Sequence, residues 1–160
     1  IAESFFPVST DPKNRYIAGL SMGGYGALKI ALSNPEKFSK VASLSGAVDI
    51  LSLGKKLVDE GSLENLNEFY NIFGNLDDFE GSDNDLFHLA NECAKSKIKP
   101  DIFLTCGTED FLYDDNINFK NLLETLPFNF TYDEGPGVHH WDYWDLKIQA
   151  VLKWLDIKPL

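Results

Sequence analysis

The 160-residue sequence is poor in cysteine and histidine and contains no long apolar run. Its two cysteines, Cys93 and Cys106, do not form a C-x-x-C pair and are too few for a disulfide framework, which excludes a small disulfide-stapled scaffold. No stretch approaches the roughly 20 apolar residues that a membrane-spanning helix needs. Unpaired cysteines fit a reducing compartment, so we expect a cytoplasmic protein.

Positive charge is also scarce, because 14 Lys and Arg face 25 Asp and Glu and leave a formal net charge of -11. Such a surface repels phosphate backbones and anionic lipids, so nucleic acid and membranes are not expected as partners. A neutral or cationic small molecule is easier to accommodate. The alternative is that the charge serves only solubility. A homo-oligomer is compatible with this composition.

Apolar residues are abundant by contrast, at 44% of the chain with 12 Phe, 6 Tyr and 3 Trp. A chain of this length and composition can bury the core of one ordinary domain. We expect a single domain over residues 1–160, in which residues 49–82 form an irregular, cap-like excursion with weak helices at Leu51–Asp59 and Leu66–Phe73.

Short apolar segments alternate with segments of helical periodicity along the rest of the chain. Strands are predicted at Arg15–Leu20, Lys40–Leu44, Asp101–Cys106 and Phe128–Glu134, the last at or near a sheet edge. Helices are predicted at Gly23–Leu32, Asp85–Ser96, Leu112–Leu126 and about Trp141–Leu155. This order predicts an α/β fold with a mostly parallel sheet and helices on both faces. In the last helix, Trp141, Tyr143, Trp144 and Trp154 are expected to serve helix packing rather than a sugar-binding platform, although Trp141 could do both.

The most informative motif is Gly-Leu-Ser-Met-Gly at residues 19–23, which lies between a predicted strand and a predicted helix. G-x-S-x-G in that context is typical of a nucleophile elbow, which exposes the hydroxyl of Ser21 on a strained turn. We expect Gly19 and Gly23 to be required because a Cβ would strike the neighbouring strand or helix, and Gly24 and Gly26 to let the helix approach the sheet. The alternative, a phosphate-binding turn, lacks the G-x-G-x-x-G and G-K-[ST] patterns.

A serine nucleophile needs a base, and only three histidines exist. His88 lies within a predicted amphipathic helix and is expected to be packed or solvated there. His139 and His140 follow the last predicted strand, at the sheet edge where ligands gather in parallel α/β proteins. We favour His139 over His140 as the base. The remaining alternative is that both are surface histidines.

The acid that orients the base is predicted to be Asp110, just beyond the third strand, which gives the chain order Ser, Asp, His. Glu109 is the rival, whereas Asp114 and Asp115 fit stabilisation of the following helix N-terminus better. A metal site is a further alternative, because His139, His140, Asp142 and Asp145 crowd together. Adjacent histidines do not readily share one ion, so no metal is expected.

Four motifs in order, GLSMGGYGALKIAL, SLSGA, CGTEDFLYDDN and PGVHHWDYWD, resemble the esterase D group of α/β-hydrolases. Within that group the chain is most similar to the bacterial tributyrin esterases and related acetyl esterases. S-formylglutathione hydrolases, feruloyl esterases and mycolyltransferases are more distant relatives. The family often has serine directly after the base, where this chain has His140.

The resemblance implies the α/β-hydrolase fold, with residues 1–160 as the C-terminal catalytic portion of one domain and the N-terminal strands missing from this chain. It implies Ser21 as nucleophile, Asp110 as acid, His139 as base and no cofactor. The N–H of Met22 is expected to contribute to the oxyanion hole, and a loop before Ile1 supplies a second donor. The expected reaction is hydrolysis of short-chain acyl esters. The alternatives are a thioesterase of the S-formylglutathione hydrolase type, a carbohydrate esterase, an acyltransferase, or a truncated domain that only binds.

Overall fold

Four parallel strands form the centre of the computed structural model, which describes residues 5, 9–59, 61 and 63–157. They are β1 (Tyr16–Leu20), β2 (Lys40–Leu44), β3 (Asp101–Gly107) and β4 (Phe130–Gly135), and they neighbour one another in chain order. The strands predicted from sequence are therefore confirmed, with ends shifted by up to two residues. As expected, the last of them, β4, is an edge strand.

The strand register brings the carboxyl ends of all four strands to one edge of the sheet. Leu20 pairs with Leu44, Leu44 with Thr105, and Gly107 with Gly135. Loops that leave this edge start at neighbouring points in space even when they are far apart in sequence. The loops after β1, β3 and β4 carry all the residues selected above as nucleophile, acid and base.

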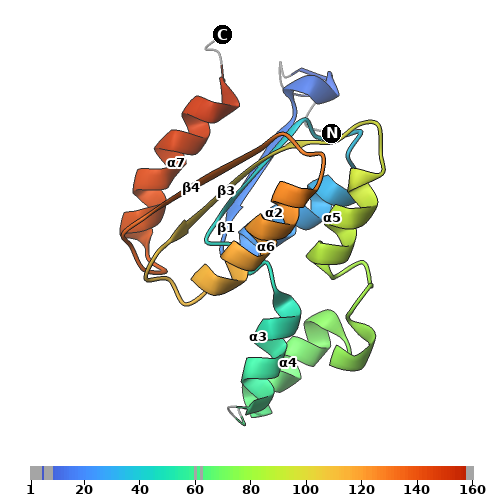
Figure 1. The fold of residues 1–160 in the computed structure, drawn as a ribbon, viewed down its shortest axis with the longest axis vertical. Coiled ribbons are helices and arrows are strands. Elements are labelled where there is room, and N and C mark those ends of the chain that lie inside the picture. The colour runs from blue at the N-terminus through green and yellow to red at the C-terminus, as the bar shows by residue number, and fades with distance from the viewer. Residues whose placement is uncertain (1–4, 6–8, 60, 62, 158–160) are drawn as a thin grey trace.

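Helices cover both faces of the sheet, as the α/β prediction required (Figure 1). On one face lie α2 (Met22–Ser33), α5 (Leu86–Ala94) and α6 (Tyr113–Thr125), and on the other lies α7 (Trp141–Leu155). Successive side chains of a strand point to opposite faces, so β3 serves both cores. Ile102 and Leu104 pack with Leu28 and Phe119, whereas Phe103 packs on the α7 side. Each fully buried side chain of this size contributes about 1.5–3 kcal/mol.

The segment between β2 and α5 departs from the sheet and contains α3 (Ile50–Asp59), α4 (Leu63–Phe73) and the short 3-10 helix η2 (Leu76–Asp78). Figure 1 shows α3 and α4 side by side at one end of the molecule, beyond the ends of the strands. An ion pair ties α3 to α6, because Nζ of Lys56 lies 3.2 Å from Oδ2 of the buried Asp115. A further 3-10 helix, η1 (Pro12–Asn14), precedes β1.

Helix boundaries follow local chemistry. Asp85 caps α5, because its Oδ1 accepts the N–H groups of Phe87 and His88. Near the C-terminus, α7 ends at Leu155, and the C-cap residue Asp156 adopts a left-handed conformation. None of the helices in the described part of the chain is both long and apolar enough to cross a bilayer.

Candidate active site

Ser21 occupies the sharp turn between β1 and α2. Its φ of 53° and ψ of -124° lie outside the regions that L-residues favour, so the strained turn expected of a nucleophile elbow is present. Such strain costs about 1–3 kcal/mol and persists only where the surroundings hold it. Here the Ser21 N–H donates to Leu44 O at 3.0 Å, and Ser21 O accepts the N–H groups of Gly24, Tyr25 and Ala47.

The glycines around this turn are not equally constrained. A Cβ on Gly19 would lie 2.1 Å from Gly23 O, and a Cβ on Gly24 would lie 2.5 Å from Ser43 Oγ, so neither position tolerates a side chain easily. The expectation for Gly23 and Gly26 was wrong. A Cβ at either position meets no atom of the described residues within 4 Å, so both positions have room for a side chain. Close packing of α2 on β2 therefore depends on Gly24.

His139 lies in the loop between β4 and α7 and faces Ser21. Its Nε2 is 2.9 Å from Ser21 Oγ, within hydrogen-bond distance. The imidazole is mostly buried and is flanked by two aromatic rings. The centroid of Phe111 lies 4.8 Å and that of Trp144 lies 4.9 Å from the centroid of the imidazole. These contacts fix the plane of the ring, so that one nitrogen faces the serine and the other faces the interior.

The carboxylate of Asp110 meets the interior nitrogen of that ring. His139 Nδ1 lies 2.9 Å from Asp110 Oδ2 and 3.1 Å from Oδ1, and the side chain of Asp110 is fully buried. The N–H of Leu112 also donates to Oδ1 at 2.9 Å. An ionised carboxylate only accepts, so Nδ1 carries the proton and Nε2 is left to accept from the serine hydroxyl.

The rival residues lie elsewhere. The carboxylate of Glu109 accepts the N–H of Gly137, and this hydrogen bond holds the pKa of the exposed carboxyl below its usual range. The same contact links the loop that carries Asp110 to the loop that carries His139. The side chain of His140 is exposed and caps α7, because its Nδ1 accepts the N–H of Asp142 at 3.4 Å. His88 lies half-buried on α5.

The two aspartates expected to stabilise the N-terminus of α6 differ from each other. Both lie in its first turn, but neither is the N-cap, which is Leu112. Asp114 is exposed, whereas Asp115 is buried against Lys56 and Ser52. Among the described residues, no group of three or more His, Cys, Asp or Glu side chains is placed to hold a metal ion.

Four exposed apolar side chains lie within two positions of Ser21, Asp110 or His139, and of these Phe111 and Val138 were not selected from the sequence in any role. They are Met22, Phe111, Val138 and Trp141, and we call them the apolar rim. Trp141 is 65% exposed, yet its indole packs edge-on against that of the buried Trp144 with ring centroids 5.4 Å apart, so it serves helix packing and also remains open to a ligand. The available signal was this adjacency, since an apolar residue next to a reactive one is well placed to touch its substrate.

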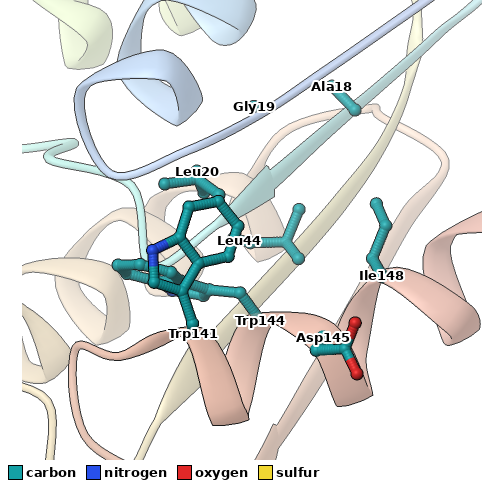
Figure 2. Close-up of a pocket in the computed structure, with 8 residues that line it drawn as sticks. All are labelled: Ala18, Gly19, Leu20, Leu44, Trp141, Trp144, Asp145 and Ile148. Carbon is teal, nitrogen blue, oxygen red and sulfur yellow. The ribbon is translucent and has the colours of Figure 1, made fainter.

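A cavity of about 270 Å³ opens beside the rim, between β1 and α7. Figure 2 shows the two indoles at the end near Leu20, and Asp145 and Ile148 further along α7. The residues that line the cavity are Ala18, Gly19, Leu20, Leu44, Trp141, Trp144, Asp145 and Ile148. Asp145 is the only charged side chain among these lining residues.

Comparison with known proteins identifies the family of this chain. The model of the family described as putative esterase matches residues 2–155. An acetyl esterase of Caldicellulosiruptor saccharolyticus is 32% identical over 154 residues, which make up 95% of this chain and 58% of that protein. The chain therefore spans somewhat more than half the length of this relative.

Solved structures show the same relationship. S-formylglutathione hydrolase FrmB of Staphylococcus aureus superposes with a TM-score of 0.82 and 31% identity, over 96% of this chain and 59% of that one. FphF, a fluorophosphonate-binding serine hydrolase of the same organism, gives a TM-score of 0.83 and 34% identity, over 98% and 60% of the two chains. The predicted fold class, a parallel α/β sheet of the serine hydrolase type, is confirmed.

Proposed function

Because this chain belongs to the putative esterase family, we propose that it is the catalytic portion of a serine carboxylesterase in which Ser21 is the nucleophile, His139 the base and Asp110 the acid. The observation that carries the proposal is the continuous line of hydrogen-bond contacts from Asp110 through both nitrogens of His139 to Ser21 Oγ. A serine hydroxyl becomes a useful nucleophile only when such a base can take its proton.

In the first half of the reaction, Ser21 Oγ attacks the ester carbonyl carbon while His139 Nε2 takes the hydroxyl proton. Asp110 stabilises the resulting imidazolium through its contact with Nδ1. The tetrahedral intermediate collapses when its carbon–oxygen bond to the alcohol breaks and His139 protonates the departing oxygen. The acyl group is then esterified to Ser21.

In the second half, His139 takes a proton from water, whose oxygen attacks the acyl carbon. The bond to Ser21 Oγ breaks, the proton returns to the serine and the carboxylic acid leaves. Neither half of this reaction consumes a cofactor or a metal ion. The enzyme is regenerated in its starting protonation state.

The negative oxygen of both intermediates needs hydrogen-bond donors. Met22 is the first residue of α2, so its N–H has no acceptor within the helix and lies next to the reacting hydroxyl. We assign it as one oxyanion donor. The family resemblance implies that a second donor comes from another loop. Loss of one such donor costs about 10²–10³ in rate.

The surroundings of Ser21 favour a neutral, short-chain acyl ester as substrate, as in the tributyrin and acetyl esterases of the esterase D group. The apolar rim offers no cation, and the chain has a net charge of -11. An anionic substrate would be repelled during approach. The 32% identity to an acetyl esterase supports the same substrate class.

A thioesterase of the S-formylglutathione hydrolase type is the second candidate, because a protein of that name is 31% identical over 96% of this chain. Its substrate carries the carboxylates of glutathione. Hydrolysis of p-nitrophenyl acetate, p-nitrophenyl butyrate, tributyrin, S-formylglutathione and an acetylated or feruloylated sugar by the intact protein distinguishes the candidates. We expect kcat/KM to be highest for the neutral short-chain esters.

The assignment of the nucleophile is tested by replacing Ser21 with alanine in the intact protein. We expect hydrolysis of p-nitrophenyl acetate to fall to the background rate, because no other hydroxyl contacts Nε2 of His139 within the described residues. Ser33→Ala is the matched control, since Ser33 is an exposed serine at the far end of α2. Retention of most activity in Ser21→Ala would refute the proposal.

A further inference from the structure

Asn116 is buried to zero exposure in the first half of α6, an unusual position for a side-chain amide. Its Nδ2 donates two hydrogen bonds, to Gly46 O and to Leu112 O, each 2.9 Å long. Within the described part of the chain, its Oδ1 has no hydrogen-bond partner. A buried acceptor without a partner costs about 1–3 kcal/mol. The two hydrogen bonds that the amide donates offset this cost.

The bond to Gly46 reaches the loop that supports the nucleophile. Ala47, the next residue, donates its N–H to Ser21 O at 3.2 Å. Gly46 itself packs against α2, because its Cα lies 3.0 Å from the place that a Cβ on Gly24 would take. The conformation of this loop therefore helps to determine where the backbone of Ser21 lies.

This loop is also strained. Ser45 has a φ of +45°, a conformation that L-residues rarely adopt, and its N–H donates to Thr105 O at 2.7 Å. A strained segment relaxes unless hydrogen bonds and packing hold it. The amide of Asn116 supplies one of these hydrogen bonds directly, from a different helix, at the residue between the strained Ser45 and Ala47.

The hydrogen bond from Asn116 to Leu112 links the amide indirectly to Asp110. Leu112 donates its N–H to Asp110 Oδ1 at 2.9 Å, while its carbonyl accepts both the Nδ2 and the backbone N–H of Asn116. The amide of Asn116 is thus hydrogen-bonded to two residues. One is Gly46, in the loop that supports Ser21, and the other is Leu112, whose N–H binds the carboxylate of Asp110.

From these contacts we propose that Asn116 is a positioning residue, which sets the nucleophile and the acid at the separation that His139 bridges. It touches neither substrate nor the reacting atoms and acts through Gly46 and Leu112. The proposal rests on the proposed function. It goes further by assigning a role in catalysis to a side chain outside the triad. Displacements of about 1 Å in such a frame cost roughly 10²-fold in rate.

The test replaces Asn116 in the intact protein by aspartate, which keeps the shape but removes both donated bonds, and by leucine, which is apolar and of similar size. Asn118→Asp and Asn118→Leu are matched controls, because Asn118 is exposed on the same helix. Each variant is measured for kcat and KM with p-nitrophenyl acetate, for its rate of labelling by a fluorophosphonate, and for folding by circular dichroism.

We expect the Asn116 variants that fold to lose roughly 10- to 100-fold in kcat and in labelling rate, with KM nearly unchanged, because positioning acts on the reacting groups. The Asn118 variants should match the wild type. Asn116→Ser retains one hydrogen-bond donor, so its kcat and labelling rate should fall less than those of the aspartate and leucine variants. It also provides the test if neither of those two variants folds.

Folded Asn116 variants with wild-type kcat would overturn the inference, as would a failure of all three variants to fold, since Asn116 would then serve stability alone. An inactive wild type would instead refute the proposed function. The failures of the two proposals are therefore distinguishable.

Discussion

The buried carboxylate of Asp110 lies 2.9 Å from Nδ1 of His139, on the side of the imidazole opposite to Ser21. This contact orients the ring, selects the tautomer with a free Nε2 and provides a negative charge beside the imidazolium that forms during reaction. The two residues come from loops after β3 and β4, which the glycine pair Gly107 and Gly137 brings into contact. A Cβ on Gly107 would lie 2.1 Å from Gly137 O.

Asp110→Asn should lower kcat by about 10²–10⁴-fold while the protein remains folded, because the amide can present its N–H to Nδ1 and favour the wrong tautomer. Steady-state kinetics with p-nitrophenyl acetate measures the effect. Asp114→Asn is the matched control, since Asp114 is an exposed aspartate in the same acidic segment. Equal activity of the two variants would count against Asp110 as the acid.

His139→Ala and His140→Ala should differ sharply although the two residues are adjacent. We expect His139→Ala to lose about 10²–10⁴-fold in kcat, because it removes the base that contacts Ser21 Oγ. His140→Ala should keep most of its activity, since this side chain is exposed and caps α7. The reverse ranking would show that the base had been assigned to the wrong residue.

Two glycine-to-alanine substitutions in α2 should change the free energy of unfolding in opposite directions. Gly26→Ala places a methyl group in open space and improves helix propensity, so it should add about 0.5–1 kcal/mol. Gly24→Ala places its Cβ 2.5 Å from Ser43 Oγ and 3.0 Å from Gly46 Cα and should cost about 1–3 kcal/mol. Urea denaturation measures both, and a stabilising Gly24→Ala would contradict the packing described.

Stability should fall at alkaline pH for a reason that the structure specifies. Burial raises the pKa of Cys93 to about 11 and that of Cys106 to about 12. Above pH 9 the unfolded chain releases these protons while the folded protein retains them, so the free energy of unfolding decreases as pH rises. Each such proton contributes a slope of about 1.4 kcal/mol per pH unit.

Urea midpoints measured between pH 8 and 11 test this dependence. The wild type should lose stability across the range, and the double variant with Cys93→Ala and Cys106→Ala should lose less per pH unit. Because the comparison is between slopes, the constant cost of the two small cavities does not affect it. Identical slopes would show that the buried thiols are not responsible.

The main features of the fold could be predicted because hydrophobic periodicity and turn residues are local. The strand Lys40–Leu44 and the helix Trp141–Leu155 have the predicted ends, since a short apolar run and a long amphipathic one are each unambiguous. The choice between His139 and His140 was harder. In extended backbone, which His140 adopts, neighbouring side chains point to opposite sides, and spacing does not tell which one faces inward.

Other features depended on tertiary contacts that no local pattern records. Whether Gly23 or Gly24 needs to lack a side chain is decided by how α2 lies on β2. The amide of Asn116 looks like an ordinary polar residue of α6 until Gly46, 70 positions earlier, is found against it. Sequence periodicity likewise does not specify that Trp141, the first residue of α7, is exposed while Trp144 is buried.

The most direct measurement is to treat the intact protein with a fluorophosphonate probe and to map the modified residue by mass spectrometry. A hydroxyl attacks such a probe readily only when a base has activated it. The account predicts a single adduct on the peptide that contains Ser21, formed at a rate that collapses in His139→Ala and persists in His140→Ala. Ester hydrolysis accompanied by labelling at another residue, or by none, would contradict it.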